Sequence, residues 1–194
     1  MDLMEALYQR RSVRAFTEEP VPAKQVRMLL DAAIQAPSAM NHQPWAFVVI
    51  QDPKELKRLS DEAKAHYLNH ADLHPTHHSP LHAFHDTLAN PDYNLFYDAS
   101  TLILICATSA SGFAPGDCCF AAQNLMLAAH GMGLATCTIG LAVPWLSHPA
   151  TKAELGIPDD YLPMVPLILG HPREQPLKPE RQPPEVLRWV RRAP

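Results

Sequence analysis

The stretch Pro37–Trp45, with the sequence PSAMNHQPW, separates a helical segment from a run of residues typical of a β-strand. Before it, apolar residues recur at helical spacing over 23–35, which predicts a helix opened by two prolines. After it, WAFVVI at 45–50 is apolar on both faces, which predicts a central strand. The stretch itself combines a hydroxyl, two carboxamides and an imidazole with stiffening prolines. Such side chains suit the edge of a flat heterocycle, although an ordinary polar connection has the same composition.

Helices and strands alternate along the rest of the chain. Further helices are predicted over 2–9, 53–68, 118–130 and near 151–155, and further strand segments over 102–107, 134–140 and 164–170. This order predicts an α/β (α+β) fold in one domain over 1–194, with a mixed β-sheet flanked by helices on both faces. The segment 118–130 is apolar nearly all round, so we expect a subunit interface to cover it.

Composition and charge narrow the class of protein. With 194 residues, 47% hydrophobic and 19% charged, the chain has the length and composition of one globular domain. Its net charge of −4 argues against nucleic-acid binding, which needs clustered basic surface. The four cysteines form no CxxC pair. We therefore expect them to be small, buried apolar side chains of a protein in a reducing cytoplasm. The first residues also lack the pattern of a signal peptide.

A long uncharged region raises the question of a membrane span. Between Ala99 and Thr151, Asp117 is the only charged residue. Polar side chains such as Gln123, Asn124 and His130 interrupt the region, however, and would be costly to place in lipid. A buried helix, a turn and a buried strand are therefore expected, with no membrane.

Basic residues gather near the N-terminus and in the tail. An extended backbone over 10–16 places Arg10, Ser12 and Arg14 on one side and Val13 on the other. Guanidinium groups match phosphate oxygens bidentately, so this segment is a candidate anion clamp. A solvated basic patch at a helix end is the alternative. The tail from 171 to 184 is rich in proline, which predicts an extended arm ending in apolar residues.

Seven of the eleven histidines lie between 66 and 85. His66, His70 and His74 have helical i,i+4 spacing, which can ligate a metal if the helix continues that far. Pro75 and Pro80 interrupt the segment, so the other interpretation is a mobile, polar excursion bordering a binding site.

Taken together, these motifs resemble the FMN-dependent nitroreductase family over nearly the whole chain. The resemblance rests on Arg10-Arg11-Ser12-Val13-Arg14 after a short helix, on Pro-Ser-x-x-Asn-x-Gln-Pro-Trp at 37–45, on 121–129 running into Gly133-Leu134, on Ile139-Gly140, and on Gly170-His171-Pro172 before Lys178 and Arg181. The sequence departs from the family at His171, where tyrosine is usual, and in the histidine-rich stretch.

The resemblance implies a domain-entwined homodimer with two FMN sites, each built from both chains, and NADH or NADPH as electron donor. It implies phosphate and ribityl contacts from Arg10, Arg11, Ser12, Arg14, Lys178 and Arg181. It implies flavin contacts from Pro37, Ser38 and Asn41 of the other subunit, and from the backbone at Ile139, Gly140 and Leu141. No side chain need act as acid or base, so no catalytic residue is assigned.

The implied reaction passes electrons by a ping-pong mechanism from NAD(P)H through flavin N5 to a nitroaromatic, quinone or similar electron-poor acceptor. Two alternatives remain open at this point. One is a flavin-binding carrier or sensor without NAD(P)H turnover, and the other is an enzyme of the same fold with different flavin chemistry.

Overall fold

The computed structural model describes residues 2–70, 80–108, 112–174 and 176–191. The helices in these ranges are α1 (Leu3–Gln9), α2 (Ala23–Ala33), α3 (Pro53–His70), α4 (Pro80–Ala89), α5 (Ala114–Gly131), α6 (Val143–Leu146) and α7 (Pro149–Glu154), with short 3-10 helices η1 (Ala39–Asn41) and η2 (Gly140–Ala142). The strands are β1 (Trp45–Ile50), β2 (Thr101–Ala107), β3 (Ala135–Thr138) and β4 (Leu162–Gly170). None of the helices in the described ranges is both long and apolar enough to cross a membrane.

The four strands form one sheet in the order β1-β2-β4-β3, and every neighbouring pair is antiparallel. Parallel pairing occurs at an isolated bridge between Ser12 and Thr136, beside β3. The predicted layering of helices on a β-sheet is confirmed, and the mixed character of the sheet rests on this bridge.

Strand β2 shows why the sheet separates two hydrophobic cores. Its successive side chains point to opposite faces, as they do in any strand. Leu102 and Leu104 enter the core on the side of α3, whereas Ile103 and Ile105 enter the core on the side of α2 and α5. The strand is buried along its whole length, as expected for an apolar run in the middle of a sheet.

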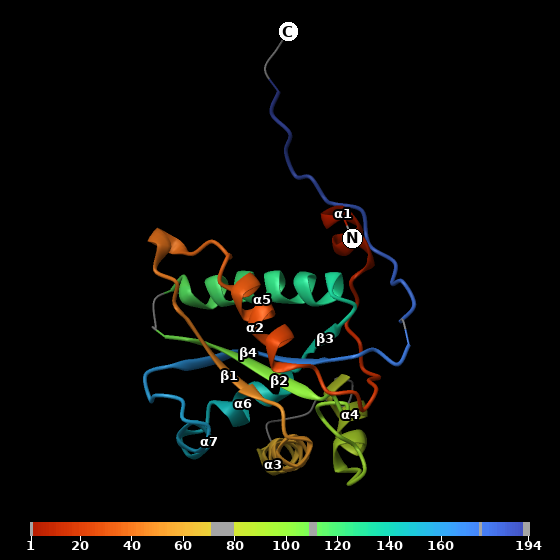
Figure 1. Cartoon of the computed structure of the whole chain (residues 1–194), viewed down its shortest axis with the longest axis vertical. Coiled ribbons are helices and arrows are strands. Elements are labelled where there is room, and N and C mark those ends of the chain that lie inside the picture. Colours follow the sequence, from red (N-terminus) through yellow and green to blue (C-terminus); the bar gives the residue numbers. More distant parts are fainter. Residues whose placement is uncertain (1, 71–79, 109–111, 175, 192–194) are drawn as a thin grey trace.

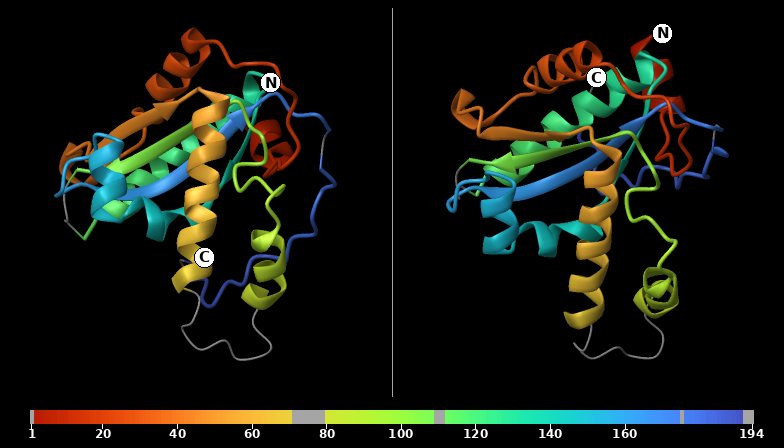
Figure 2. Two further views of the ribbon diagram at one scale, coloured as in Figure 1. Left: turned by 90° about the horizontal axis from the view of Figure 1, so that it is seen from below. Right: turned by 60° about the horizontal axis from the view of Figure 1, so that its bottom comes forward.

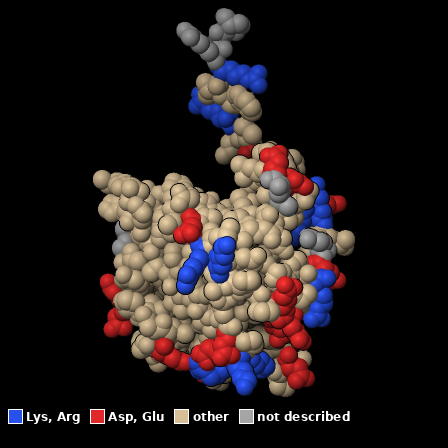
Figure 3. Space-filling view, in the orientation of Figure 1, with Lys and Arg blue, Asp and Glu red and all other residues tan. Residues whose placement is uncertain are grey.

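Helices cover both faces of the sheet (Figures 1 and 2). Helices α2 and α5 pack on one face, while α3 and α6 lie on the other. Small residues of α5, such as Ala121 and Ala129, let this helix approach the sheet closely. Its outer side is exposed, however: Phe120 is 53% exposed, and Phe113, which directly precedes the helix, is 71% exposed. Figure 3 shows few charged side chains on the face of the molecule that carries α2 and α5.

The prediction that β1 is a central strand is wrong, because β1 forms one edge of the four-stranded sheet. Its apolar pattern has another cause. Helices cover the sheet even at this edge, so Ala46 and Val48 pack against one core while Trp45 and Phe47 pack against the other.

The stretch 66–85, interpreted from the sequence as a mobile, polar excursion, is helical in part, since α3 continues to His70 and α4 begins at Pro80. Proline suits the first turn of a helix, where its missing N–H costs no hydrogen bond. His74, the third residue of the proposed metal-ligating pattern of His66, His70 and His74, lies outside the described residues. Among the residues that are described, no group of side chains is placed to hold a metal ion.

Candidate functional site

The larger of two relevant pockets, here called the large pocket, opens where the end of β3 faces the segment before β2. Its volume is about 510 Å³, within the range of roughly 300–1,000 Å³ typical of small-molecule sites. It is lined by Arg14, Leu95, Tyr97, Thr138, Ile139, Gly140 and Leu141. Arg14 and the Ile139–Leu141 segment, both singled out from the sequence, therefore meet at this place. The amide of Ile139 donates to the Pro166 carbonyl at 2.9 Å, which ties this wall to β4.

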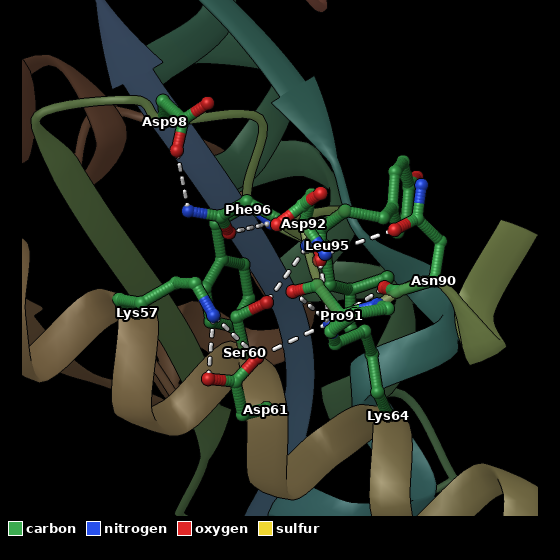
Figure 4. Close-up of polar contacts among 12 residues, drawn as sticks. Lys57, Ser60, Asp61, Lys64, Asn90, Pro91, Asp92, Leu95, Phe96 and Asp98 are labelled. Carbon is green, nitrogen blue, oxygen red and sulfur yellow. Dashed lines mark hydrogen bonds and ion pairs between the residues drawn. The ribbon is translucent and has the colours of Figure 1, made fainter.

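The opposite wall is held by α3 through buried hydrogen bonds (Figure 4). The Lys64 ammonium group donates to the carbonyls of Tyr93 at 2.6 Å and Asn90 at 3.3 Å. The Ser60 hydroxyl accepts the backbone N–H of Leu95 at 2.8 Å. Because these groups come from one rigid helix, they fix the loop that places Leu95 in the large pocket.

The same loop has a strained backbone at its end. Tyr97 and Asp98 have φ angles of 53° and 55°, a region that costs about 1–2 kcal/mol for a residue with a side chain. The Asn94 side chain compensates locally, because it accepts the N–H of Phe96 at 2.9 Å and donates to Asp98 at 2.8 Å. The guanidinium carbon of Arg14 lies 6.0 Å from the centre of the Tyr97 ring. Strain of this kind concentrates at functional sites.

A second, smaller pocket, here called the polar pocket, lies where the ends of α1 and α5 approach β3. Its volume is about 160 Å³. Three of its lining residues each have a polar atom that is buried without a hydrogen-bond partner in the described structure: Arg10 Nη1, His130 Nε2 and Thr136 Oγ1. Buried polar atoms are almost always paired, so three unpaired ones in one pocket indicate a place for a ligand. Since arginine only donates, that ligand must supply acceptor atoms.

Electrostatics give the polar pocket a preference for anions. Burial lowers the pKa of Arg10, and repulsion from Arg11 and Arg181 lowers it further. Burial also lowers the pKa of His130, with further contributions from Arg10 and Arg11. A bound anion would offset this repulsion.

Strand β3 joins the two pockets. Thr136 lines the polar pocket and Thr138 lines the large pocket, two residues or roughly 7 Å further along the strand. The N-terminal segment runs beside them, with the Val13 N–H donating to the Thr136 carbonyl at 3.1 Å. Val13 is buried while Ser12 and Arg14 are exposed, which confirms the alternation predicted from sequence. The pair of pockets suits an elongated ligand with a flat ring at one end and an anion at the other.

The loop 37–45 lies elsewhere in the same chain. The Asp117 carboxylate, in the first turn of α5, accepts the N–H of Ala39 at 3.2 Å and 3.4 Å. His130, in the polar pocket, is 13 residues further along α5, a distance of about 20 Å. One chain therefore does not bring Pro37, Ser38 and Asn41 to the pockets that hold Arg10 and Arg14.

Within this loop the backbone is again strained. Met40, Asn41 and Gln43 all have positive φ angles, between 49° and 57°. The Ser38 hydroxyl accepts the N–H of Gln43 at 2.9 Å, and the Gln43 side chain donates to that of Asn41 at 3.2 Å. The loop thus has a defined shape, with Met40 91% exposed at its tip.

The tail residues are placed differently from one another. Arg181 is close enough to Arg10 to affect its pKa, whereas Lys178 is exposed and lines neither pocket. His171, the departure from the family pattern, lines neither pocket in the described structure. Its Nε2 lies 3.7 Å from the Glu19 carboxylate, which is an ion-pair distance but too long for a hydrogen bond.

Sequence reasoning missed Leu95, Tyr97, Thr136, Thr138 and His130 as pocket residues. The threonines had a signal, since they flank the recognised Ile139-Gly140 motif in a strand. Leu95 and Tyr97 had none, because only the tertiary structure brings their loop to the pocket. All four cysteines are free. Burial raises the pKa of Cys118 to about 12 and that of Cys106 to about 11, which leaves them as unreactive thiols.

Known proteins share the sequence pattern and the fold of this chain. The sequence model of the Nitroreductase family matches residues 7–171, so this chain belongs to that family. The matched range includes α5, the whole sheet and every residue of the large pocket.

Individual relatives agree with this assignment. A nitrobenzene nitroreductase from Ectopseudomonas oleovorans is 31% identical over 83% of this chain and 82% of its own length. An FMN reductase (NAD(P)H) from Bacillus subtilis is 28% identical over 96% of this chain and 72% of its own length. The crystal structure of a nitroreductase with bound FMN from Bacteroides fragilis superposes with a TM-score of 0.82, at 25% identity and 98% coverage of both chains.

Proposed function

We propose that this chain is an FMN-dependent oxidoreductase that passes electrons from NADH or NADPH to nitroaromatic, quinone or similar electron-poor acceptors. The proposal includes a cytoplasmic homodimer and one domain over 1–194, with 171–194 as an arm. One observation carries it: Arg10 and Thr136, each with an unpaired polar atom, line the polar pocket, and β3 leads from Thr136 to Thr138 in a pocket large enough for a flat ring. FMN has a phosphate at one end and such a ring at the other.

The residues present fit that cofactor. Arg10 and Arg11, with Arg181 nearby, would hold the phosphate by charge-assisted hydrogen bonds. Ser12 would lie beside the ribityl chain, and Lys178 would complete the basic set from the arm. Arg14 would place a positive charge beside the ring, where its contact with Tyr97 restrains it.

When bound, FMN supplies the acceptor and donor of hydride, so no side chain need act as acid or base. The chain itself positions the flavin ring and its substrates. Because the Ile139 amide is bonded to Pro166, the amides of Gly140 and Leu141 are the backbone donors that would face the ring. Nicotinamide and acceptor would use the same open face in turn, which is a ping-pong mechanism.

The homodimer is proposed because one chain leaves the site incomplete. The loop with Pro37, Ser38 and Asn41 is about 20 Å from the polar pocket, so a second copy would supply it. The exposed apolar side chains of α5 offer a surface for that copy. The arm also ends in exposed apolar side chains, since Leu187 is 90% exposed and Trp189 is 70% exposed.

Spectroscopy of the purified full-length protein tests the reaction. We expect a yellow protein whose flavin absorbance is bleached anaerobically by NADH or NADPH and restored by a nitroaromatic or quinone. Arg14→Ala should retain FMN more weakly, while Lys54→Ala, a surface change on α3, should not. A colourless protein that takes up no added FMN would contradict the proposal. Yellow protein that neither nicotinamide reduces would favour a carrier or sensor instead, and other products would indicate different flavin chemistry.

Complementation tests the shared site. Arg14→Ala and Asn41→Ala subunits, each impaired alone, are mixed after dissociation and reassociated. If each site uses Arg14 of one chain and Asn41 of the other, a mixed dimer has one site with both changes and one site with neither. Activity should therefore reappear on mixing, and its failure to do so in verified mixed dimers would refute the arrangement.

A further inference from the structure

His130 has no role in the proposed function so far. It lies in the last turn of α5, and its Nε2 atom is buried without a hydrogen-bond partner in the described structure. The Arg10 Nη1 atom is also buried and unpaired, and both residues line the polar pocket. Thr136, which is 1% exposed, adds an unpaired hydroxyl from β3.

These three groups come from three different elements and share one pocket. An anionic acceptor bound there would offer these groups the partner that they lack, whereas water or an uncharged group would leave the repulsion between the cations in place. The volume of about 160 Å³ is too small for a flavin ring but adequate for a tetrahedral anion.

We propose that the Nε2 atom of His130 is a further ligand of the FMN phosphate, donating a hydrogen bond beside Arg10 and Thr136. The inference rests on the proposed function and adds a residue to that site. It also has a consequence: His130 takes up a proton as the phosphate enters, so FMN binding is linked to pH.

The charges around His130 explain the uptake. Burial and the nearby Arg10 and Arg11 keep the pKa of His130 below its ordinary value, and Glu5 of α1 opposes them weakly. Near neutral pH the imidazole of the FMN-free protein is therefore neutral. A bound phosphate with a charge of about −1.5 to −2 raises the pKa of His130.

The direction of the pH dependence follows from linkage. A group whose pKa rises on binding contributes affinity that is lost as the pH increases through its pKa in the complex. FMN affinity should therefore fall as the pH is raised above neutral. The second ionisation of the phosphate, near pH 6, acts in the opposite direction and is nearly complete there. Measurements between about pH 7 and pH 9 separate the two effects.

The experiment titrates FMN and riboflavin, which has no phosphate, into the flavin-free full-length protein and follows quenching of flavin fluorescence. The variants are His130→Ala, His130→Gln and, as the matched control, His148→Ala at the start of α7. Loss of a hydrogen bond to a charged group should weaken FMN binding roughly tenfold to a hundredfold in His130→Ala. Riboflavin binding should not change. His130→Gln keeps a neutral donor, so it should retain part of the affinity but lose the pH dependence above neutral.

Three results would overturn the inference: wild-type FMN affinity in His130→Ala, an equal loss for FMN and riboflavin, or an unchanged pH dependence in His130→Gln. If His130→Ala fails to fold, the pH dependence of FMN binding in His130→Gln still tests the inference. Failure of the proposed function looks different, because the wild-type protein itself would then bind neither flavin.

Discussion

Lys64→Met should destabilise the protein far more than the loss of a surface charge would. The Lys64 side chain is 7% exposed, and its ammonium group donates to the carbonyls of Tyr93, Asn90 and Pro91 and contacts Asp61 at 3.1 Å. Methionine fills similar space but donates no hydrogen bond. The substitution therefore leaves buried carbonyls without a partner while preserving the packing.

The size of the effect follows from the distances. Only the bond to Tyr93, at 2.6 Å, is short, while those to Asn90 and Pro91 are 3.3 Å and 3.5 Å long. A hydrogen bond from a charged donor contributes about 1.5–3 kcal/mol, and the two long bonds add little to it. We expect a loss of about 2–3 kcal/mol in the free energy of unfolding. For a chain of this length, that lowers Tm by roughly 5–10 °C.

The assay is urea unfolding of Lys64→Met and of its matched control Lys57→Met. Lys57 belongs to the same helix and pairs with the same Asp61, but its side chain is 44% exposed. An exposed i,i+4 pair contributes only about 0.3–0.5 kcal/mol. Because the loop held by Lys64 carries Leu95 and Tyr97, the same variant should also bind flavin more weakly. Equal unfolding midpoints for the two variants would refute the reasoning.

Two further substitutions test contacts around the site. A Cβ atom at Gly170 would lie 2.8 Å from the Phe16 ring. Gly170→Ala should therefore lower the free energy of unfolding, measured by thermal unfolding, by about 1–3 kcal/mol. Gly131→Ala, which has open space around the new Cβ atom, should be nearly neutral. Asp117→Ala removes the acceptor of the Ala39 N–H, so hydrogen exchange should accelerate within the loop 37–45, and unchanged protection there would show that α5 does not hold the loop.

Local periodicity was sufficient to predict the elements on which the site is built. The alternation at 10–14 depends only on the geometry of an extended chain, and the structure shows it with Val13 buried and Ser12 exposed. The strand β2 was predictable for a similar reason, because the uninterrupted apolar run at 102–107 is buried on both faces.

Tertiary arrangement was less accessible to sequence reasoning. β1 has the apolar pattern of a central strand because helices cover the edge that it forms, and no local signal distinguishes the two situations. Tyr97 is a comparable case, since positive φ angles are expected at glycine or asparagine rather than at an aromatic residue. The loop that carries Tyr97 is held by buried hydrogen bonds from α3, which lies some thirty residues earlier in the chain.

Helix α5 explains why the motifs recognised in the sequence fall into two groups. Its first turn binds the loop 37–45 through Asp117, and its last turn places His130 in the polar pocket. A rigid helix keeps these ends about 20 Å apart, so no movement of side chains can unite the groups within one chain. In the proposed homodimer, a second copy packed on the exposed side that carries Phe120 would supply the missing wall. If complementation succeeds, the apolar character of α5 follows from its position between the sheet of one chain and the surface of the other.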